Sequence, residues 1–350
     1  MLKDAHEFLC FQYASTSRVT LERLPTLGPI QSFCSTRVGD TTWHICGDSQ
    51  GWIYTRQIPN TQCVGDLHRW TADPIMRSSD PISSISASGS HCVISCLGPG
   101  KVMVQNMLDP ELLFLLKFNS LNDIWTCHLQ GSSLILGASR KAAYISDIDV
   151  SRVPEHLATG SDVFSITRQN SLVYTGSRTG SIHRFDLRTS KNRSHILFDD
   201  RFGTSPRSSV VHLDMIRDHE LLTSHSNGDL LTYDVRFTTK STKSFPVKSF
   251  EGHVNSYTHN LGIAVDHERD LLYAAGQDNH IRAWSLRTGL PLAPQITNKR
   301  GNPLTTAFSD PIFSLQVADE AGKDGVSLWA TSGRELYEFH LGQRGLGPKG

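Results

Sequence analysis

Two short segments repeat an aromatic residue, an Asp, one apolar residue and an Arg: FDLR at Phe185–Arg188 and YDVR at Tyr233–Arg236. A partial third copy is WSLR at Trp284–Arg287, in which Ser285 occupies the place of the Asp. The guanidinium group of Arg is planar and can bond carboxylates or carbonyls through parallel N–H groups. An Asp two residues earlier can restrain that group. The pattern therefore indicates a contact to a polar surface of a partner.

The segment GDSQG at Gly47–Gly51 satisfies G-x-S-x-G, the turn that carries the nucleophilic serine of α/β hydrolases. That chemistry needs a strand, a strained turn and then a helix. Here a strand-like segment, WIYTRQI, follows the turn. We therefore interpret the segment as a hairpin turn. The sequence has no P-loop, G-x-G-x-x-G or HExxH motif, so we expect neither an enzyme nor a cofactor. The least favoured hypothesis, a serine hydrolase, predicts an esterase activity that Ser49→Ala abolishes.

The seven cysteines all lie between Cys10 and Cys127, and no two of them form a CxxC pair. The sixteen histidines are scattered along the chain without the spacing of a metal site. An odd number of cysteines in an intracellular chain is typical of reduced thiols in the core. We expect no metal site.

The charge is balanced, with 34 Lys and Arg against 34 Asp and Glu. This argues against a protein held to nucleic acid or to an anionic membrane by bulk charge. Apolar runs such as Leu112–Leu116 are far shorter than the roughly 20 residues that span a bilayer. The N-terminal segment lacks the apolar core of a signal peptide. We expect an intracellular protein, in the nucleus, the cytoplasm or both, with no membrane association and no direct binding of nucleic acid.

An apolar strand, a polar turn and a second strand recur along the chain, as in LVYTGSRTGSIHRFD at Leu172–Asp186 and LLTSHSNGDLLTYD at Leu221–Asp234. The seven turns are indexed by Gly51, Gly100, Lys141, Gly180, Gly228, Asn279 and Arg334. They are spaced by about 40 to 55 residues, which is typical of propellers with four strands per blade. Apolar residues also alternate with polar ones after the turns, as at His280–Ala283. The sequence thus predicts an all-β fold, a seven-bladed β-propeller.

The details of the strands and turns can be predicted as well. Asn227-Gly228 is a favoured hairpin dipeptide, and glycine can supply a positive φ at Gly51, Gly100 and Gly180. The apolar run Leu112–Phe118 is interpreted as a buried strand.

The two ends of the chain predict how the ring closes. Residues 341–350 are rich in glycine and are expected to form a flexible tail, so the seventh blade lacks an outer strand. Residues 1–25 form a leader in which Arg18–Leu24 alternates like a strand. We expect this strand to complete the seventh blade and remove an exposed edge. The propeller itself is assigned to residues 26–340.

The repeats resemble WD repeats, and the sixth copy matches best. Gly252-His253 precedes that blade, Asp278 lies in its turn and Trp284 follows six residues later. In that family the His, a strand Ser or Thr, the Asp and the Trp form a buried hydrogen-bonded tetrad. The resemblance implies this role for His253, Asp278 and Trp284, although Ala274 occupies the place of the Ser or Thr.

The two Asp-x-Arg copies also resemble the WDxR signature of cullin-4-associated factors, the substrate receptors of cullin-4 RING ubiquitin ligases. Within that group, Ser249–Gly289 is similar to the sixth-blade region of the factor numbered four. The resemblance implies docking on the ligase adaptor, damaged-DNA-binding protein subunit one, and presentation of an unknown target protein for ubiquitination. The implied docking residues are Arg188, Arg236, Asp186, Asp234, Phe185 and Tyr233.

One other class of function stays open. In a WD-repeat scaffold of an unrelated complex, such as a chromatin or trafficking complex, the Asp-x-Arg pairs only stabilise the ends of strands.

Overall fold

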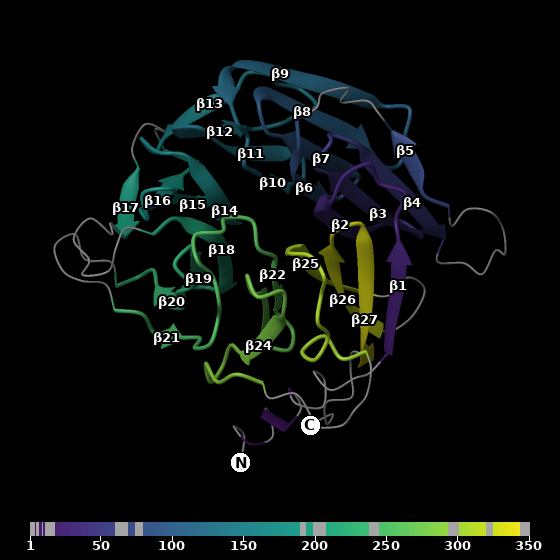
Figure 1. The fold of residues 1–350 in the computed structure, drawn as a ribbon. Helices are drawn as coiled ribbons and strands as arrows, with labels where there is room; N and C mark the ends of the chain where they lie inside the picture. Colours follow the sequence, from purple (N-terminus) through teal and green to yellow (C-terminus); the bar gives the residue numbers. More distant parts are fainter. Residues whose placement is uncertain are drawn as a thin grey trace.

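The computed structural model describes residues 4, 7–8, 10, 18–59, 69–73, 80–189, 194–198, 208–237, 245–292, 301–319 and 325–343. These residues form seven antiparallel sheets arranged as blades around a central axis (Figure 1). The predicted seven-bladed propeller is therefore confirmed. No helix within the described ranges is long and apolar enough to span a bilayer.

The strands follow one another in chain order from the centre of the ring outward within each blade. Blades 1 to 3 comprise β2 (Ile30–Val38), β3 (Thr41–Asp48), β4 (Ile53–Pro59) and β5 (Thr71–Asp73); β6 (Ile82–Ser88), β7 (His91–Cys96), β8 (Pro99–Asn106) and β9 (Leu113–Asn122); β10 (Thr126–Gln130), β11 (Ser133–Ala138), β12 (Lys141–Ile145) and β13 (Glu155–Ala158). Blades 4 to 6 comprise β14 (Val163–Gln169), β15 (Leu172–Ser177), β16 (Ile182–Asp186) and β17 (His195–Phe198); β18 (Val210–Arg217), β19 (Glu220–His225), β20 (Leu230–Asp234) and β21 (Lys248–Ser249); β22 (Ile263–Asp266), β23 (Leu271–Ala275) and β24 (Ile281–Ser285).

Blade 7 joins the two ends of the chain. It contains β25 (Ile312–Asp319), β26 (Gly325–Ser332) and β27 (Glu335–Gln343), and its outer strand is β1 (Arg18–Arg23). β1 pairs antiparallel with β27 from Arg18 opposite His340 to Arg23 opposite Glu335. The predicted closing strand is confirmed (Figure 1). β27 extends to Gln343, into the residues predicted as a tail, and residues 344–350 lie outside the described ranges, as does most of the leader.

The core consists of apolar layers between neighbouring blades, because each sheet packs between the preceding sheet and the following sheet of the ring. Seven clusters of buried residues occur among the described residues, and each combines side chains from two adjacent blades. Between blades 5 and 6, for example, Leu222 and Leu230 pack with Leu272 and Trp284. Full burial of one such aliphatic side chain contributes about 1.5–3 kcal/mol.

The turn glycines match the prediction at three positions and differ at one. Gly51, Gly180 and Gly228 have φ values of 79°, 84° and 97°, as expected of hairpin turns. In blade 2 the positive φ of 90° belongs to Gly98, not to Gly100. Gly100 lies within β8, where an added Cβ would come within 2.5 Å of the Leu121 carbonyl oxygen. Glycine is therefore needed there because the backbone of β9 passes close by, not because of a turn.

The run Leu112–Phe118 forms a strand as predicted, but it is not a buried one. It contributes to β9, the outer strand of blade 2, in which Leu116 and Phe118 are buried while Leu115 and Lys117 face outward. Only alternate residues of β9 pack against the neighbouring blade, so an uninterrupted apolar run does not indicate burial of the whole strand here.

The thiols lie where the cysteine pattern predicted. Six of the seven are buried and form no disulfide within the described ranges, and Cys63 lies outside those ranges. Burial raises the pKa of Cys34 to about 12 and that of Cys127 to about 11. These thiols are therefore protonated and unreactive at neutral pH.

Candidate functional site

The first Asp-x-Arg copy forms a closed fork directly after β16. Arg188 donates Nε to Asp186 Oδ1 at 3.0 Å and Nη2 to Asp186 Oδ2 at 2.8 Å. The backbone N–H of Arg188 donates to the same Oδ1 at 3.0 Å. The Arg188 side chain is 74% exposed and that of Asp186 is 24% exposed. The carboxylate thus holds a guanidinium group that faces solvent.

The second copy repeats this geometry after β20. Arg236 donates Nε to Asp234 Oδ1 at 3.0 Å and Nη2 to Asp234 Oδ2 at 2.6 Å, and its backbone N–H donates to Oδ1 at 3.0 Å. The Arg236 side chain is 57% exposed. Its guanidinium carbon also lies 5.5 Å from the ring centre of Phe237, an exposed aromatic residue. Identical contacts in two blades mean that the short sequence itself determines the fork.

The arginines keep both carboxylates ionised. Hydrogen bonds from the side chain and the backbone of Arg188 lower the pKa of Asp186 from 3.8 to about 2. The side chain of Arg236 lowers the pKa of Asp234 to the same value. Each fork is therefore present at every pH above about 3.

The aromatic residue of each copy packs between two blades. Phe185 is buried among residues of blades 3 and 4, including Tyr144 and Val163. Tyr233 is partly buried, and its ring centre lies 4.5 Å from that of Phe198 in the neighbouring blade. These rings fix where the third strand ends and hence where the fork begins.

The two forks lie on the same side of the ring. The residue between Asp and Arg donates its backbone N–H to the turn between the first two strands of its blade, Leu187 to Ser171 and Val235 to His219. Gln169 Nε2 donates to the Asp218 carbonyl and so joins these turns across blades 4 and 5. We call the rim that carries the loops after β16, β20 and β24 the DxR rim.

In blade 6 the same backbone contact recurs, but the carboxylate comes from elsewhere. Leu286 donates its N–H to the Asp270 carbonyl, which places Arg287 as Arg188 and Arg236 are placed. Ser285 stands where the motif has Asp, and Arg287 Nε instead donates to Asp270 Oδ2 at 2.6 Å. The sequence analysis missed Asp270, because it lies 17 positions before Arg287 and only strand pairing brings the two together.

Of the three residues predicted as a tetrad, His253 and Asp278 lie in loops of the opposite rim and Trp284 lies within β24, and each bonds elsewhere. His253 interacts with the carbonyls of Gly228 and Ala275, each at 3.2 Å, and Trp284 Nε1 donates to the Glu251 carbonyl at 2.9 Å. Asp278 accepts two hydrogen bonds from Arg282, at 2.9 and 2.6 Å. The rings of His253 and Trp284 still meet edge to face, with centres 6.3 Å apart.

The G-x-S-x-G segment is a hairpin turn, so the hydrolase hypothesis is wrong. β3 leads into the turn and β4, a strand rather than a helix, follows it. Asp48 is fully buried and accepts from the backbone N–H groups of Gly28, Gln50 and Trp52 at 3.1, 2.9 and 2.8 Å. The important residue of this segment is therefore a structural carboxylate and not Ser49.

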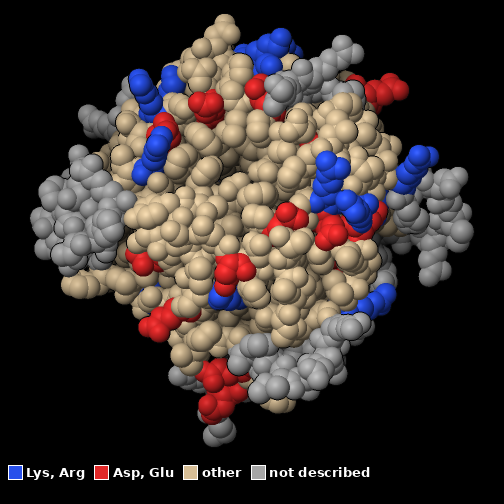
Figure 2. Space-filling view, in the orientation of Figure 1, with Lys and Arg blue, Asp and Glu red and all other residues tan. Residues whose placement is uncertain are grey.

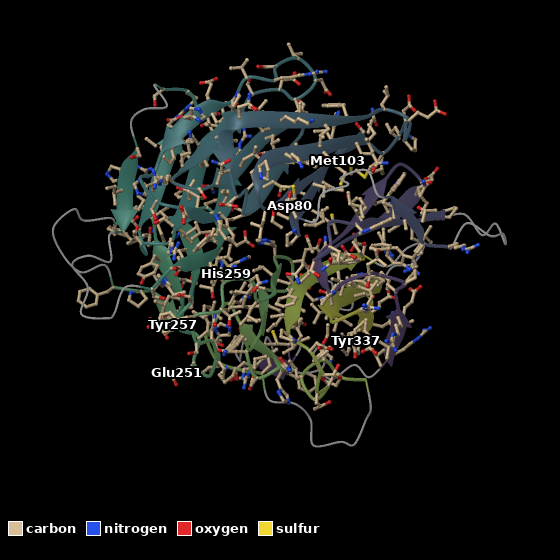
Figure 3. All side chains as sticks on the ribbon, turned by 45° about the horizontal axis from the view of Figure 1, so that its top comes forward. Asp80, Met103, Glu251, Tyr257, His259 and Tyr337 are labelled. Carbon is tan, nitrogen blue, oxygen red and sulfur yellow. The ribbon has the colours of Figure 1, made fainter. Side chains whose placement is uncertain are left out.

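A small pocket opens at the central channel on the opposite rim. Three aromatic rings line it: Trp125 and Phe164 meet edge to face at 5.1 Å, and His259 lies 5.7 Å from Phe164. In Figure 3 His259 lies nearer the centre of the ring than Tyr257 or Glu251. Desolvation lowers the pKa of His259, so it is neutral at neutral pH. The lining carries no charged residue within the described ranges.

Charge is intermixed over the molecule rather than gathered by sign. Figure 2 shows Lys and Arg next to Asp and Glu in several places, on a face that is mostly neither. Among the described residues, no group of three or more His, Cys, Asp or Glu side chains is placed to hold a metal ion.

Comparison with known families identifies this propeller. The profile of the DDB1- and CUL4-associated factor 4 beta-propeller domain matches residues 91–340. The chain belongs to this family. The resemblance of the chain to the cullin-4-associated factors, and to the factor numbered four among them, is thereby confirmed at the level of the family. Members of this family are protein-interaction propellers and not enzymes.

Curated relatives of this DCAF4-type propeller agree. DDB1- and CUL4-associated factor 4 from Bos taurus is 31% identical over 228 residues, and the Homo sapiens protein is 30% identical over 225 residues. Each alignment covers 61% of this chain and 41% of the relative. DDB1- and CUL4-associated factor 4-like protein 2 from Homo sapiens is 26% identical over 226 residues, covering 59% of this chain and 54% of that protein. The chain thus matches less than half the length of the first two relatives.

Solved structures of low identity share the DCAF4-type fold. The beta-propeller domain of Myceliophteria thermophila Cps50 (Swd1) superposes with a TM-score of 0.62 at 13% identity, covering 91% of this chain and 99% of that one. The WD40 beta propeller domain of Doa1 superposes with a TM-score of 0.64 at 12% identity, covering 93% and 96%. These matches concern the fold alone.

Proposed function

We propose that this protein is a substrate receptor of a cullin-4 RING ubiquitin ligase. In this role the DxR rim docks on the adaptor, DDB1 (damaged-DNA-binding protein subunit one), and another face presents a target protein. The receptor performs no chemistry itself. It raises the local concentration of the target near the ubiquitin-charged enzyme. The proposal places the protein inside the cell, in the nucleus, the cytoplasm or both, and includes no binding to nucleic acid.

The observation that carries the proposal is the pair of matching forks in adjacent blades. Asp186 and Asp234 each engage Nε and Nη2 of one arginine, and no partner of Nη1 occurs among the described residues. Each arginine therefore presents N–H groups to solvent in a fixed direction. A fixed guanidinium group loses little conformational freedom when it binds, which favours its use at a docking surface. The names of the relatives associate those proteins with DDB1 and CUL4.

The test is the double variant Arg188→Ala/Arg236→Ala, with purified DDB1 as the binding partner. We expect affinity to fall at least a hundredfold, since contacts of two charged groups are lost. The melting temperature should stay within about 2 °C, because ion pairs between solvent-exposed side chains contribute little to stability.

A matched control is available on the opposite rim. Arg178 pairs with Asp162 and Arg282 pairs with Asp278, so Arg178→Ala/Arg282→Ala also removes two arginines held by aspartates. This control should bind DDB1 like the unaltered protein. If the DxR variant keeps its affinity and only its stability falls, the alternative of a WD scaffold in an unrelated complex is favoured.

A further inference from the structure

The loop after β24 is built like the two loops that carry the forks. In all three blades the residue before the arginine donates its N–H to the turn between the first two strands: Leu187 to Ser171, Val235 to His219 and Leu286 to Asp270. A second backbone bond returns to the motif position in each blade. In blades 4 and 5 it comes from the third residue after it, Thr189 to Asp186 and Phe237 to Asp234, and in blade 6 it comes from the fourth, Gly289 to Ser285. Arg287 therefore follows the same contact with the facing turn as the two fork arginines, in a turn that closes one residue later.

The carboxylate that binds Arg287 belongs to a residue of the facing turn and not to the residue at the end of the strand. The turn residue is Ser171 in blade 4 and His219 in blade 5, and only in blade 6 is it an Asp. Asp270 holds Arg287 from there, through Nε at 2.6 Å. The side chain of Arg287 is 59% exposed, which is comparable with Arg236.

The relocated carboxylate leaves more of the guanidinium group available. Asp186 and Asp234 each engage both Nε and Nη2 of one arginine. Asp270 accepts from Arg287 through Oδ2 alone, because its Oδ1 accepts from Arg217 Nη2 at 2.9 Å. Arg217 in turn pairs with Glu220, and Glu220 pairs with Lys248, so this network fixes Asp270 from blade 5. Both terminal nitrogens of Arg287 have no partner among the described residues.

We propose that Arg287 is a third docking arginine, positioned by Asp270, and that it takes a carboxylate of the partner through its two terminal nitrogens. This inference rests on the proposed function, since it concerns the same docking surface. The end of a guanidinium group with two unbonded nitrogens matches the two oxygens of a carboxylate. The fork arginines keep one free N–H on Nη2 and both on Nη1, so they can make the same end-on contact, whereas Arg287 offers all four N–H groups of its two terminal nitrogens. The three arginines lie in successive blades along one rim.

The test measures the affinity of the full chain for purified DDB1. We expect Arg287→Ala to weaken binding roughly ten- to hundredfold. Arg287→Lys should weaken it nearly as much, because an ammonium group cannot form the two parallel bonds. The control is Arg282→Ala, which removes an Asp-paired arginine from the same blade on the opposite rim and should leave affinity unchanged. Unchanged affinity of Arg287→Ala overturns the proposal, and full affinity of Arg287→Lys overturns the two-nitrogen contact.

Asp270 is a positioning residue and needs a separate measurement, because it also binds Arg217. Asp270→Asn should weaken DDB1 binding about three- to tenfold in the unaltered protein and should have no further effect in Arg287→Ala. An equal loss in both backgrounds means that Asp270 acts through the fold alone.

The outcomes also separate this inference from the proposed function. If Arg188→Ala/Arg236→Ala abolishes binding while Arg287→Ala does not weaken it, only the third arginine is refuted. If DDB1 does not bind the unaltered protein, the proposed function fails first.

Discussion

The two rims of the propeller use the same pair of side chains for different purposes. On the DxR rim, Asp186 and Asp234 hold arginines that follow a strand and point away from the blade. On the opposite rim, Asp278 holds Arg282, which lies within β24 and is only 30% exposed. Both kinds of pair make two close hydrogen bonds. An Asp–Arg pair by itself therefore indicates no docking surface; what distinguishes the DxR rim is an exposed arginine at an equivalent position in successive blades.

The largest expected effect is on stability and comes from a deletion that prevents closure of the ring, which both rims need. Deleting residues 1–25 removes β1 and Leu24, which is buried between blades 7 and 1. It also exposes the edge of β27, which invites pairing between molecules. We expect aggregation, or a melting temperature at least 10 °C lower, in a thermal unfolding experiment.

The control for this deletion is removal of residues 344–350, which should leave melting unchanged. Unchanged melting after deletion of residues 1–25 contradicts the importance of closure by β1.

A smaller effect is expected when the carboxylates are removed and the arginines kept. Asp186→Asn/Asp234→Asn should weaken DDB1 binding about three- to tenfold, because each arginine loses its fixed direction but keeps its charge. Asp162→Asn/Asp278→Asn on the opposite rim is the matched control and should not alter affinity. Tighter binding of the first variant shows instead that the forks compete with the partner.

The smallest effect separates the two rims by their dependence on pH. On the DxR rim a hydrogen bond to Asp214 raises the pKa of His267 above 6.5, so this pair stabilises the fold fully below pH 6.5 and less as pH rises through the raised value. On the opposite rim desolvation lowers the pKa of His253, so its protonation in the unfolded chain reduces stability as pH falls below 6.5.

The corresponding measurement is thermal unfolding of His267→Gln and His253→Gln at pH 5.5 and 8.5. His267→Gln should lower the melting temperature more at pH 5.5, and His253→Gln more at pH 8.5, with differences of about 1–2 °C. If both variants lower the melting temperature more at the same pH, the opposite pKa shifts of the two histidines are contradicted.

The sequence predicted those features that depend on neighbours in the chain. The fork between Asp186 and Arg188 forms within one turn, so a sequence of four residues is enough to predict it. The ring closure was predicted because a missing outer strand at one end matched a spare strand at the other. Features that depend on register were missed, since Asp270 meets Arg287 only after β23 and β24 have paired. The requirement for Gly100 likewise comes from the approach of β9, which no local pattern reveals.

The hydrogen bonds of the tetrad residues also could not be predicted from the sequence. Their spacing was that of a WD repeat, and the three residues do gather in one place. With Ala274 in the place of the hydroxyl residue, Trp284 Nε1 instead donates to the Glu251 carbonyl. Backbone acceptors of this kind carry no signature in the sequence.

The pairing of β1 with β27 also determines when the fold can be completed during synthesis. The partner of β1 is made more than 300 residues after β1 itself, since Arg18 pairs with His340. Until then β1 has no neighbour in its sheet, and the blades already made form an open arc with an unpaired strand at its end. Contacts of such long range form slowly and leave edges exposed to aggregation. Blade 7 therefore closes the ring only after β27 has been made, and we expect the propeller to depend on chaperones until then.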